Sequence, residues 1–551
     1  MHEIITLQLG QPSNYLATHF WNTQESYFTY AEDQDSHVDH DVHWRPGLSP
    51  DGTETFMPRT VIYDLKGGFG SLRKINALYE QENEPSSLSL WSGPTVVHRQ
   101  EPIEQGAYQQ SLDAGLAPPA LTTSTVRYWS DFNRVFFHPR SIVQLNEYEL
   151  NSSLMPFENW ESGEDLFNSL DKEHDIIDRD LRPFAEEADQ MQAIQIMTTL
   201  DDAWGGFASR YMERLRDEYG KTVLWTWGLQ DSLQGVPRNK RLLRLANKAK
   251  SLTEIYKQAT MIVPLALPQR LPRSVVLDPS SQWHTSALLA SAVESITLPS
   301  RLKDSAQRIT LGGLAELLNP MGKQTVAGLQ MSFAPPPPSL EDDSPQQQQQ
   351  HSGLGRPATG LPDDISEGAH LDLRFTPSDQ LDPYAHQRQQ QNGHASGAQP
   401  RVFSQVIALR GYGDGSDADG DADMLDFDER DHRRRRRQQS AYETATQLYH
   451  SPLGFPLLDS FPRIFRDAAA GSSTGDDDDD DDALLASGTH INVTSSLSTD
   501  ASVSARLKLL RTTVVRSIGV EDREALGNDL AEMADEYHEG WSSGSDEGED
   551  D

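Results

Sequence analysis

The residues of this chain that could do chemistry gather in Thr199–Arg210, with the sequence TLDDAWGGFASR. The stretch holds two neighbouring carboxylates, Asp201 and Asp202, and two neighbouring glycines, Gly205 and Gly206. A glycine-containing turn at a helix N-terminus is where α/β proteins usually bind phosphates, because backbone N–H groups and the helix dipole favour an anion. Here two carboxylates would repel phosphate oxygens, and the tryptophan between the two pairs would block close approach of the backbone. The stretch therefore has the position of a phosphate loop without its chemistry.

The same two aspartates suit a helix end that carries no ligand. The first N–H groups of a helix have no partner within the helix, and aspartate is a preferred residue for accepting them. We therefore expect Asp201 and Asp202 to cap the helix in place of a phosphate. The alternative is a magnesium ion that bridges the carboxylates and a phosphate.

A second glycine turn lies at the start of the chain. Glu3–Leu9 (EIITLQL) predicts a strand, and Gly10, Gln11 and Asn14 follow it before a helical pattern over Tyr15–Gln24. Strand, glycine turn and helix are typical of the opening of a Rossmann-like sheet. Gly10, Gln11 and Asn14, together with Gly205 and Gly206, are thus the candidate nucleotide site, which we interpret as vestigial. We expect no cofactor, with GTP as the alternative.

Other constellations are weaker. His40 and His43 could be metal ligands, but no further ligands complete a site, so no metal is expected. Asp131, His138 and Ser141 could form a hydrolase triad, but nothing around the serine resembles a nucleophile elbow. We therefore predict no catalytic residues.

The elements that must position the candidate site follow from hydrophobic periodicity. Apolar residues three and four apart indicate helices, and short apolar runs that end in glycine or polar residues indicate strands. Strands are expected at Thr60–Leu65, Lys221–Trp227 and Val402–Arg410, and helices at Ala185–Met197, Tyr211–Tyr219, Ser251–Pro264 and Ser286–Leu298.

Composition limits the class of protein. The 551 residues carry a formal net charge of −37 and no cysteine, which argues against direct nucleic-acid binding and excludes disulfides and thiolate catalysis. The aromatic and basic stretch Val126–Gln144 is accordingly interpreted as core packing. The N-terminus resembles neither a signal nor a transit peptide, and the most apolar window, Met261–Leu267, is too short to span a bilayer. Any membrane association is expected to be peripheral.

Changes in composition divide the chain. Patterned segments alternate with a proline- and glutamine-rich stretch, an Asp/Gly stretch that meets the arginines 433–437, and acidic runs. The arginine run is interpreted as a solvated charged loop, with a nuclear-localisation or anion-binding patch as the alternative. We expect an α/β Rossmann-like domain over 1–260, a smaller α+β domain from 261–334, 401–411 and 440–520, disordered insertions at 335–400 and 412–439, and an acidic tail over 521–551.

Several segments resemble a known family. EIITLQLGQPSN with HFWN, PRTVIYDLKGG and DQMQAIQ resemble the first strand and nucleotide loop, the next strand, and the helix before the glycine-rich signature of tubulin. THFWNTQ, YDLKGGFGSL, YWSDFNRVFFHPRSI and WHTSALLASAVESITLP resemble the Misato family of tubulin-related proteins over about residues 1–330. The glycine-rich loop of tubulin corresponds here to Asp201–Phe207, and its Asn-x-Asp pair has no counterpart near Asn247–Glu254.

The resemblance implies a tubulin/FtsZ-like fold and a role in mitochondrial distribution, morphology and mitochondrial DNA inheritance, from the cytosolic face of the mitochondrion or the cytoplasm. We expect a non-enzymatic protein whose partners are the mitochondrial outer surface or cytoskeletal proteins, with tubulin or a chaperonin among the contacts. A GTPase of the tubulin superfamily and a microtubule-associated factor are the competing interpretations.

Overall fold

The computed structural model describes residues 3–29, 35–48, 54–72, 103–334, 371–377, 400–411, 445–466, 488–517 and 520–537. The insertion expected at 412–439, with its arginine run, and the aspartate run 476–482 lie outside these residues. So do 335–370, 378–399 and 538–551.

A parallel sheet organises about the first half of the chain. Within the described residues it has six strands in the order β5-β4-β1-β6-β7-β8, and every neighbouring pair is parallel. Because parallel strands all point the same way, the loops that follow them meet at one edge. The strands are β1 (Glu3–Leu9), β4 (Thr60–Lys66), β5 (Ile142–Glu149), β6 (Met191–Thr199), β7 (Val223–Gln230) and β8 (Met261–Ala266).

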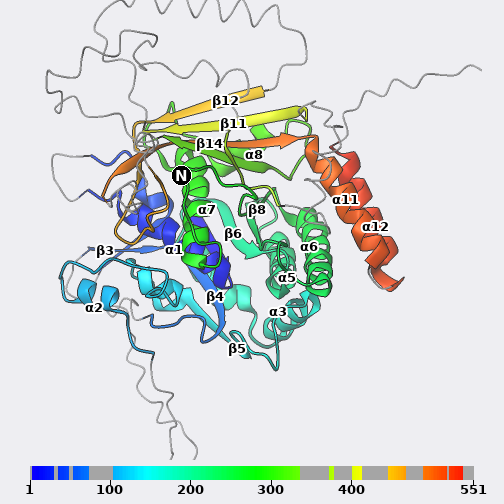
Figure 1. Ribbon diagram of the computed structural model, residues 1–551, viewed down its shortest axis with the longest axis horizontal. Helices are drawn as coiled ribbons and strands as arrows, with labels where there is room; N and C mark the ends of the chain where they lie inside the picture. Colours follow the sequence, from blue (N-terminus) through cyan, green and yellow to red (C-terminus); the bar gives the residue numbers. More distant parts are fainter. Residues whose placement is uncertain are drawn as a thin grey trace, which may run out of the picture.

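Helices cover both faces of this sheet, as Figure 1 shows. Strand side chains alternate between the faces: Ala193 and Met197 pack with α1 (Gln11–Glu25) and α7 (Gln282–Thr297), whereas Ile194 faces the opposite core. That opposite core includes α3 (Trp160–His174), α5 (Ala203–Glu218) and α6 (Arg238–Gln258). The result is a three-layer α/β domain with a Rossmann-like arrangement.

A second, smaller sheet follows. Its strand order is β10-β9-β14-β11-β12, with β13 paired to β14, and only the β11–β12 pair is parallel within the described residues. The hairpin of α11 and α12 packs against α6 of the first domain. The elements are β9 (Gly328–Ala334), β10 (Leu373–Arg374), β11 (Val402–Arg410), β12 (Ala445–Ser451), β13 (Phe455–Pro456), β14 (His490–Asp500), α8 (Leu311–Leu318), α11 (Ser502–Ser517) and α12 (Val520–Asp535). Smaller elements are β2 (Trp44–Leu48), β3 (Glu54–Pro58), α2 (Ala107–Asp113) and α4 (Arg182–Glu186).

A buried ionic cluster joins the two domains. Glu294 of α7 accepts hydrogen bonds from Arg301 at 2.6 Å, from the Tyr27 hydroxyl at 2.9 Å, and from Arg410 of β11. The two arginines and the glutamate are at most 1% exposed. Because an unpaired charge at this depth is very costly, the cluster fixes how β11 sits against α7.

The sequence prediction for residues 185–197 was wrong. The segment was expected to be a helix, but Met191–Thr199 is the central strand β6, and the short helix α4 ends at Glu186. Within this strand Ala193 and Met197 face one core and Ile194 and Ile196 face the other, so the strand is buried on both sides and has no polar face.

The bounds of other elements also differ from those predicted. Helix α6 spans Arg238–Gln258, whereas the residues expected to end it form strand β8. The stretch expected to be a disordered insertion contains β10, and the expected acidic tail begins with helix α12. Leu526 and Leu530 of α12 are buried, which explains why this charged segment packs as a helix. The α/β class with a second, smaller domain is confirmed.

Candidate functional site

The loops at the carboxyl edge of the parallel sheet surround a cleft of about 550 Å³. Helix α1 contributes Gln11 and Tyr15, and the turn after β6 contributes Asp201, Asp202 and Trp204. The loops after β5 and β7 and the start of α7 complete the wall. The structure therefore brings the two predicted glycine turns together at one edge.

The side chain of Trp204 fills the space above the first turn. Gly10 has a φ of +83°, and a Cβ at this position would lie 2.6 Å from Cδ1 of Trp204. The indole is only 4% exposed and packs against the rings of Phe157 at 5.3 Å and Phe207 at 5.6 Å. The backbone surface that glycine leaves open for a ligand is thus covered by this chain's own tryptophan.

Asp202 caps the helix that follows. It occupies the N-cap position of α5, and its Oδ1 accepts hydrogen bonds from the Trp204 backbone N–H at 2.8 Å and from the Thr199 hydroxyl. Burial raises the pKa of Asp202 to about 6, while these hydrogen bonds oppose the rise. The capping prediction is confirmed for this residue.

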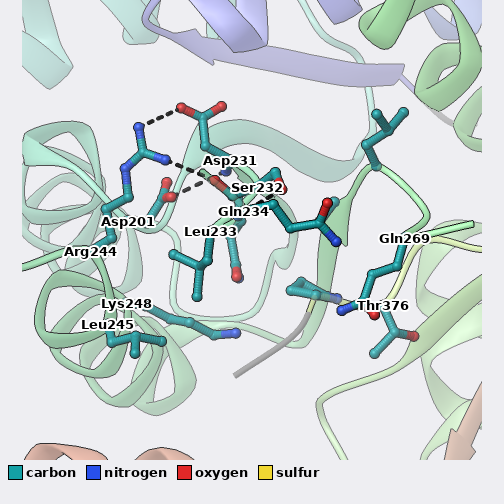
Figure 2. Close-up of a pocket in the computed structure, with 14 residues that line it drawn as sticks. Asp201, Asp231, Ser232, Leu233, Gln234, Arg244, Leu245, Lys248, Gln269 and Thr376 are labelled. Atoms are coloured by element: carbon teal, nitrogen blue, oxygen red, sulfur yellow. Dashed lines mark hydrogen bonds and ion pairs between the residues drawn. The ribbon is translucent and has the colours of Figure 1, made fainter. Parts of the chain in front are cut away.

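Asp201 plays a different role, so the prediction that it also caps the helix was wrong. Its Oδ2 accepts a hydrogen bond from the backbone N–H of Asp231 at 3.1 Å, and Asp231 pairs with Arg244 at 3.0 Å (Figure 2). Since Asp202 already occupies the N-cap, the preceding side chain points toward the β7 loop instead. Burial, and then the charges of Asp231 and Asp202, raise the pKa of Asp201 to about 8.

Gln11 and Asn14 are engaged by a buried carboxylate that the sequence analysis missed. Both side-chain amides donate to Oδ2 of Asp64, at 2.5 Å and 2.7 Å, and Gln11 also donates to the carbonyl of Gly68 at 2.6 Å. Burial raises the pKa of Asp64 to about 7. The available signal was an acidic residue inside the apolar strand β4, which is followed by a glycine pair. These donors are satisfied within the chain.

Gly205 and Gly206 lie inside α5, where they permit close helix packing. A Cβ on Gly205 would overlap Ser251 of α6, and one on Gly206 would overlap the backbone of Trp160 in α3. This packing accounts for both glycines without a phosphate, and their assignment to a nucleotide site stays a prediction.

The weaker constellations do not assemble. Within the described ranges, no group of three or more His, Cys, Asp or Glu residues could hold a metal ion. His43 is buried against Phe20 and Trp21, and His138 accepts a hydrogen bond from the Arg140 backbone. The aromatic stretch contributes Trp129 and Phe132 to the core, as predicted.

Comparison with known proteins identifies the family. Residues 2–114 match the Misato Segment II tubulin-like domain, and residues 118–302 match a tubulin domain. Protein dml-1 of Neurospora crassa is 62% identical over the full length of both chains, and Protein DML1 of Gibberella zeae is 48% identical over the full length of both. Protein dml1 of Schizosaccharomyces pombe is 33% identical over 56% of this chain and 67% of its own.

No helix among the described residues is both long and apolar enough to cross a bilayer. The cleft at the carboxyl edge and the two glycine turns beside it agree with the tubulin-like domains that the sequence matches. The chain belongs to the Misato family of tubulin-like proteins, whose fungal relatives bear the name Protein DML1.

Proposed function

We propose that this protein is a non-enzymatic member of the tubulin-like proteins that supports mitochondrial distribution, morphology and mitochondrial DNA inheritance through protein contacts. Membership of the Misato family supports the cellular role. The absence of GTP hydrolysis is supported by the turn at Gly10, where the side chain of Trp204 fills the space that a phosphate would need.

The single observation that carries the proposal is the indole of Trp204 lying on Gly10. A phosphate would have to displace a tryptophan that is 96% buried and then face Asp202 at the helix end. Two unit charges 4 Å apart interact by about 4 kcal/mol at the effective dielectric of a partly exposed site. Since about 1.4 kcal/mol changes an affinity tenfold, this repulsion alone lowers GTP affinity by more than about a hundredfold.

Nucleotide content and turnover test the proposal. Purified protein should retain no guanine nucleotide and should release no phosphate from GTP with Mg²⁺, whereas tubulin serves as the positive control. Binding of GTP at micromolar concentration, or turnover abolished by Asn14→Ala, would establish the competing GTPase interpretation.

We propose a peripheral location on the cytosolic face of the mitochondrial outer membrane and in the cytoplasm, with cytoskeletal proteins, tubulin or a chaperonin as partners. Protease added to intact mitochondria should then degrade the protein. Protection until the outer membrane is ruptured would contradict this location. Co-sedimentation with microtubules would favour the microtubule-associated alternative.

A further inference from the structure

The carboxyl-edge cleft has an unbalanced charge. Five carboxylates and three basic side chains line it, and each basic group already has an acidic partner: Lys240 pairs with Glu158 at 3.0 Å, Arg244 with Asp231 at 3.0 Å, and Arg127 with Asp131 outside the lining. Within the part of the chain that the structure describes, Glu149, Asp201 and Asp202 have no ion-pair partner.

One of these carboxylates is buried with a free oxygen. The side chain of Asp201 is only 7% exposed, yet it lines the cleft. Its Oδ2 accepts the Asp231 N–H, whereas its Oδ1 has no hydrogen-bond partner among the described residues. Oδ1 is not fully enclosed, so a donor that enters from the cleft can reach it. Burial, and then the charges of Asp231 and Asp202, raise the pKa of Asp201, and the charge of Arg244 only partly offsets this rise.

The lining of the cleft is also aromatic. Tyr15, Phe157 and Trp204 all line the cleft, and the ring of Phe157 meets the indole of Trp204 at 77°. Aromatic faces attract cations, and the flat guanidinium group both stacks on rings and donates in pairs to carboxylates. No metal-binding group of acidic or histidine side chains occurs in the described residues. The chemistry of the cleft therefore fits a guanidinium better than an anion or a metal ion.

The rim of the cleft adds an apolar element. Ser152 and Pro156 line the cleft, and between them Leu154 and Met155 are 92% and 55% exposed. Two adjacent apolar side chains at the tip of a loop gain stability when another surface covers them. A polypeptide can do this while one of its side chains enters the cleft, whereas a small amine cannot.

We propose that the cleft binds an arginine side chain of a partner polypeptide, whose apolar neighbours cover Leu154 and Met155. The guanidinium donates to Oδ1 of Asp201 and stacks against the aromatic wall. The proposal rests on the proposed absence of a nucleotide. If a nucleotide were bound in the cleft, its phosphate would itself attract the guanidinium, and the arginine would not need Asp201.

Paired peptides test the proposal on the full-length protein at physiological salt. The probe is the peptide Leu-Leu-Arg-Leu-Gly with blocked ends, and its control carries citrulline, a neutral arginine analogue, in place of arginine. Fluorescence anisotropy measures both affinities. We expect the arginine peptide to bind at least about tenfold more tightly, as for a hydrogen bond to a buried charged group.

Asp201→Asn should remove most of this preference, because asparagine keeps the acceptor for the Asp231 N–H but cannot ionise to pair with the guanidinium. Asp217→Asn is the matched control, since Asp217 is exposed near the C-terminal end of α5, the helix that follows Asp201, about 21 Å along its axis from Ala203. It should leave the preference unchanged. Circular dichroism confirms that both variants are folded.

Equal affinity of the two peptides for the wild type, or an unchanged preference in folded Asp201→Asn, overturns the arginine assignment. The double change Leu154→Ser and Met155→Ser should weaken the peptide but not arginine amide, and an unaltered peptide affinity overturns the polypeptide assignment. GTP with Mg²⁺ is tested separately. If GTP binds, the proposed function fails, whereas if neither GTP nor peptide binds, only this inference fails.

Discussion

Replacing Asp201 by asparagine should make the protein less sensitive to alkaline pH. The carboxyl group is 7% exposed, and burial together with the charges of Asp231 and Asp202 raises its pKa to about 8. In the unfolded chain the pKa returns to about 3.9. The folded state therefore holds this proton more tightly, so its stabilising contribution is complete below about pH 4 and is lost as the pH rises toward 8.

The size of the effect follows from the same shift. About 1.4 kcal/mol accompanies each pKa unit, so a rise from about 3.9 to about 8 has an upper limit of roughly 6 kcal/mol. Because part of this rise comes from the charges of Asp231 and Asp202, the effect of Asp201 alone is smaller than this limit. Between pH 5 and pH 9 we expect the free energy of unfolding of Asp201→Asn to rise by about 2–3 kcal/mol relative to that of the wild type.

Urea unfolding followed by tryptophan fluorescence measures this gain at each pH. Asp64 also has a raised pKa, but it titrates in both proteins and cancels in the difference. Asp217→Asn, on the exposed end of α5, should follow the wild-type curve. Parallel curves for Asp201→Asn and the wild type would refute the view that burial raises the pKa of Asp201.

Three further changes test the packing of the site and of the domains by urea unfolding. Trp204→Ala should lower the free energy of unfolding by about 3–5 kcal/mol, because a buried aromatic side chain is lost from above Gly10. A decrease below about 1 kcal/mol would contradict that contact. Arg410→Met should cost about 3–5 kcal/mol, because it leaves Glu294 with an incomplete set of partners, whereas the exposed Arg182→Met should cost under about 1 kcal/mol. Gly206→Ala should lower the free energy of unfolding by about 3 kcal/mol, because the added Cβ overlaps the backbone of α3. Gly220→Ala should leave it nearly unchanged, because the nearest atom to its added Cβ lies at 3.5 Å. Equal effects of the two changes would exclude the packing role of Gly206.

Local sequence patterns were sufficient for the strands that follow or precede glycine. Glu3–Leu9 and Val402–Arg410 have the predicted bounds, and Thr60–Leu65 is one residue longer. In each case a stretch rich in apolar residues ends at a glycine or a polar turn, so its length and its end are both visible in the sequence.

The central strand β6 was not visible in this way. Ala193 and Met197 face one core, Ile194 and Ile196 face the other, and Gln195 between them is buried as well. A strand covered on both faces has no polar side, so its apolar residues fall at helical spacing by coincidence. Only the pairing with β1 and β7 decides between the two interpretations.

The candidate site was predictable only as far as contacts are local. Asp202 caps the helix that begins at the next residue, and this contact could be inferred from the sequence alone. Asp64 lies 50 residues from Asn14, and Asp231 lies 30 residues from Asp201, so these partners depend on the order of the strands. The sequence identified the groups that a phosphate would need but not what replaces the phosphate.

The physical requirements of an empty phosphate loop explain these replacements together. A helix end exposes unpaired N–H groups, a glycine turn leaves open space above its backbone, and polar side chains beside it need partners. Asp202 accepts the Trp204 N–H, the Trp204 indole fills the space above Gly10, and Asp64 accepts the amides of Gln11 and Asn14. A nucleotide would have to break contacts of all three kinds before making its own. These contacts support the proposed absence of a nucleotide, and within the described residues Glu149, Asp201 and Asp202 of the same cleft have no ion-pair partner.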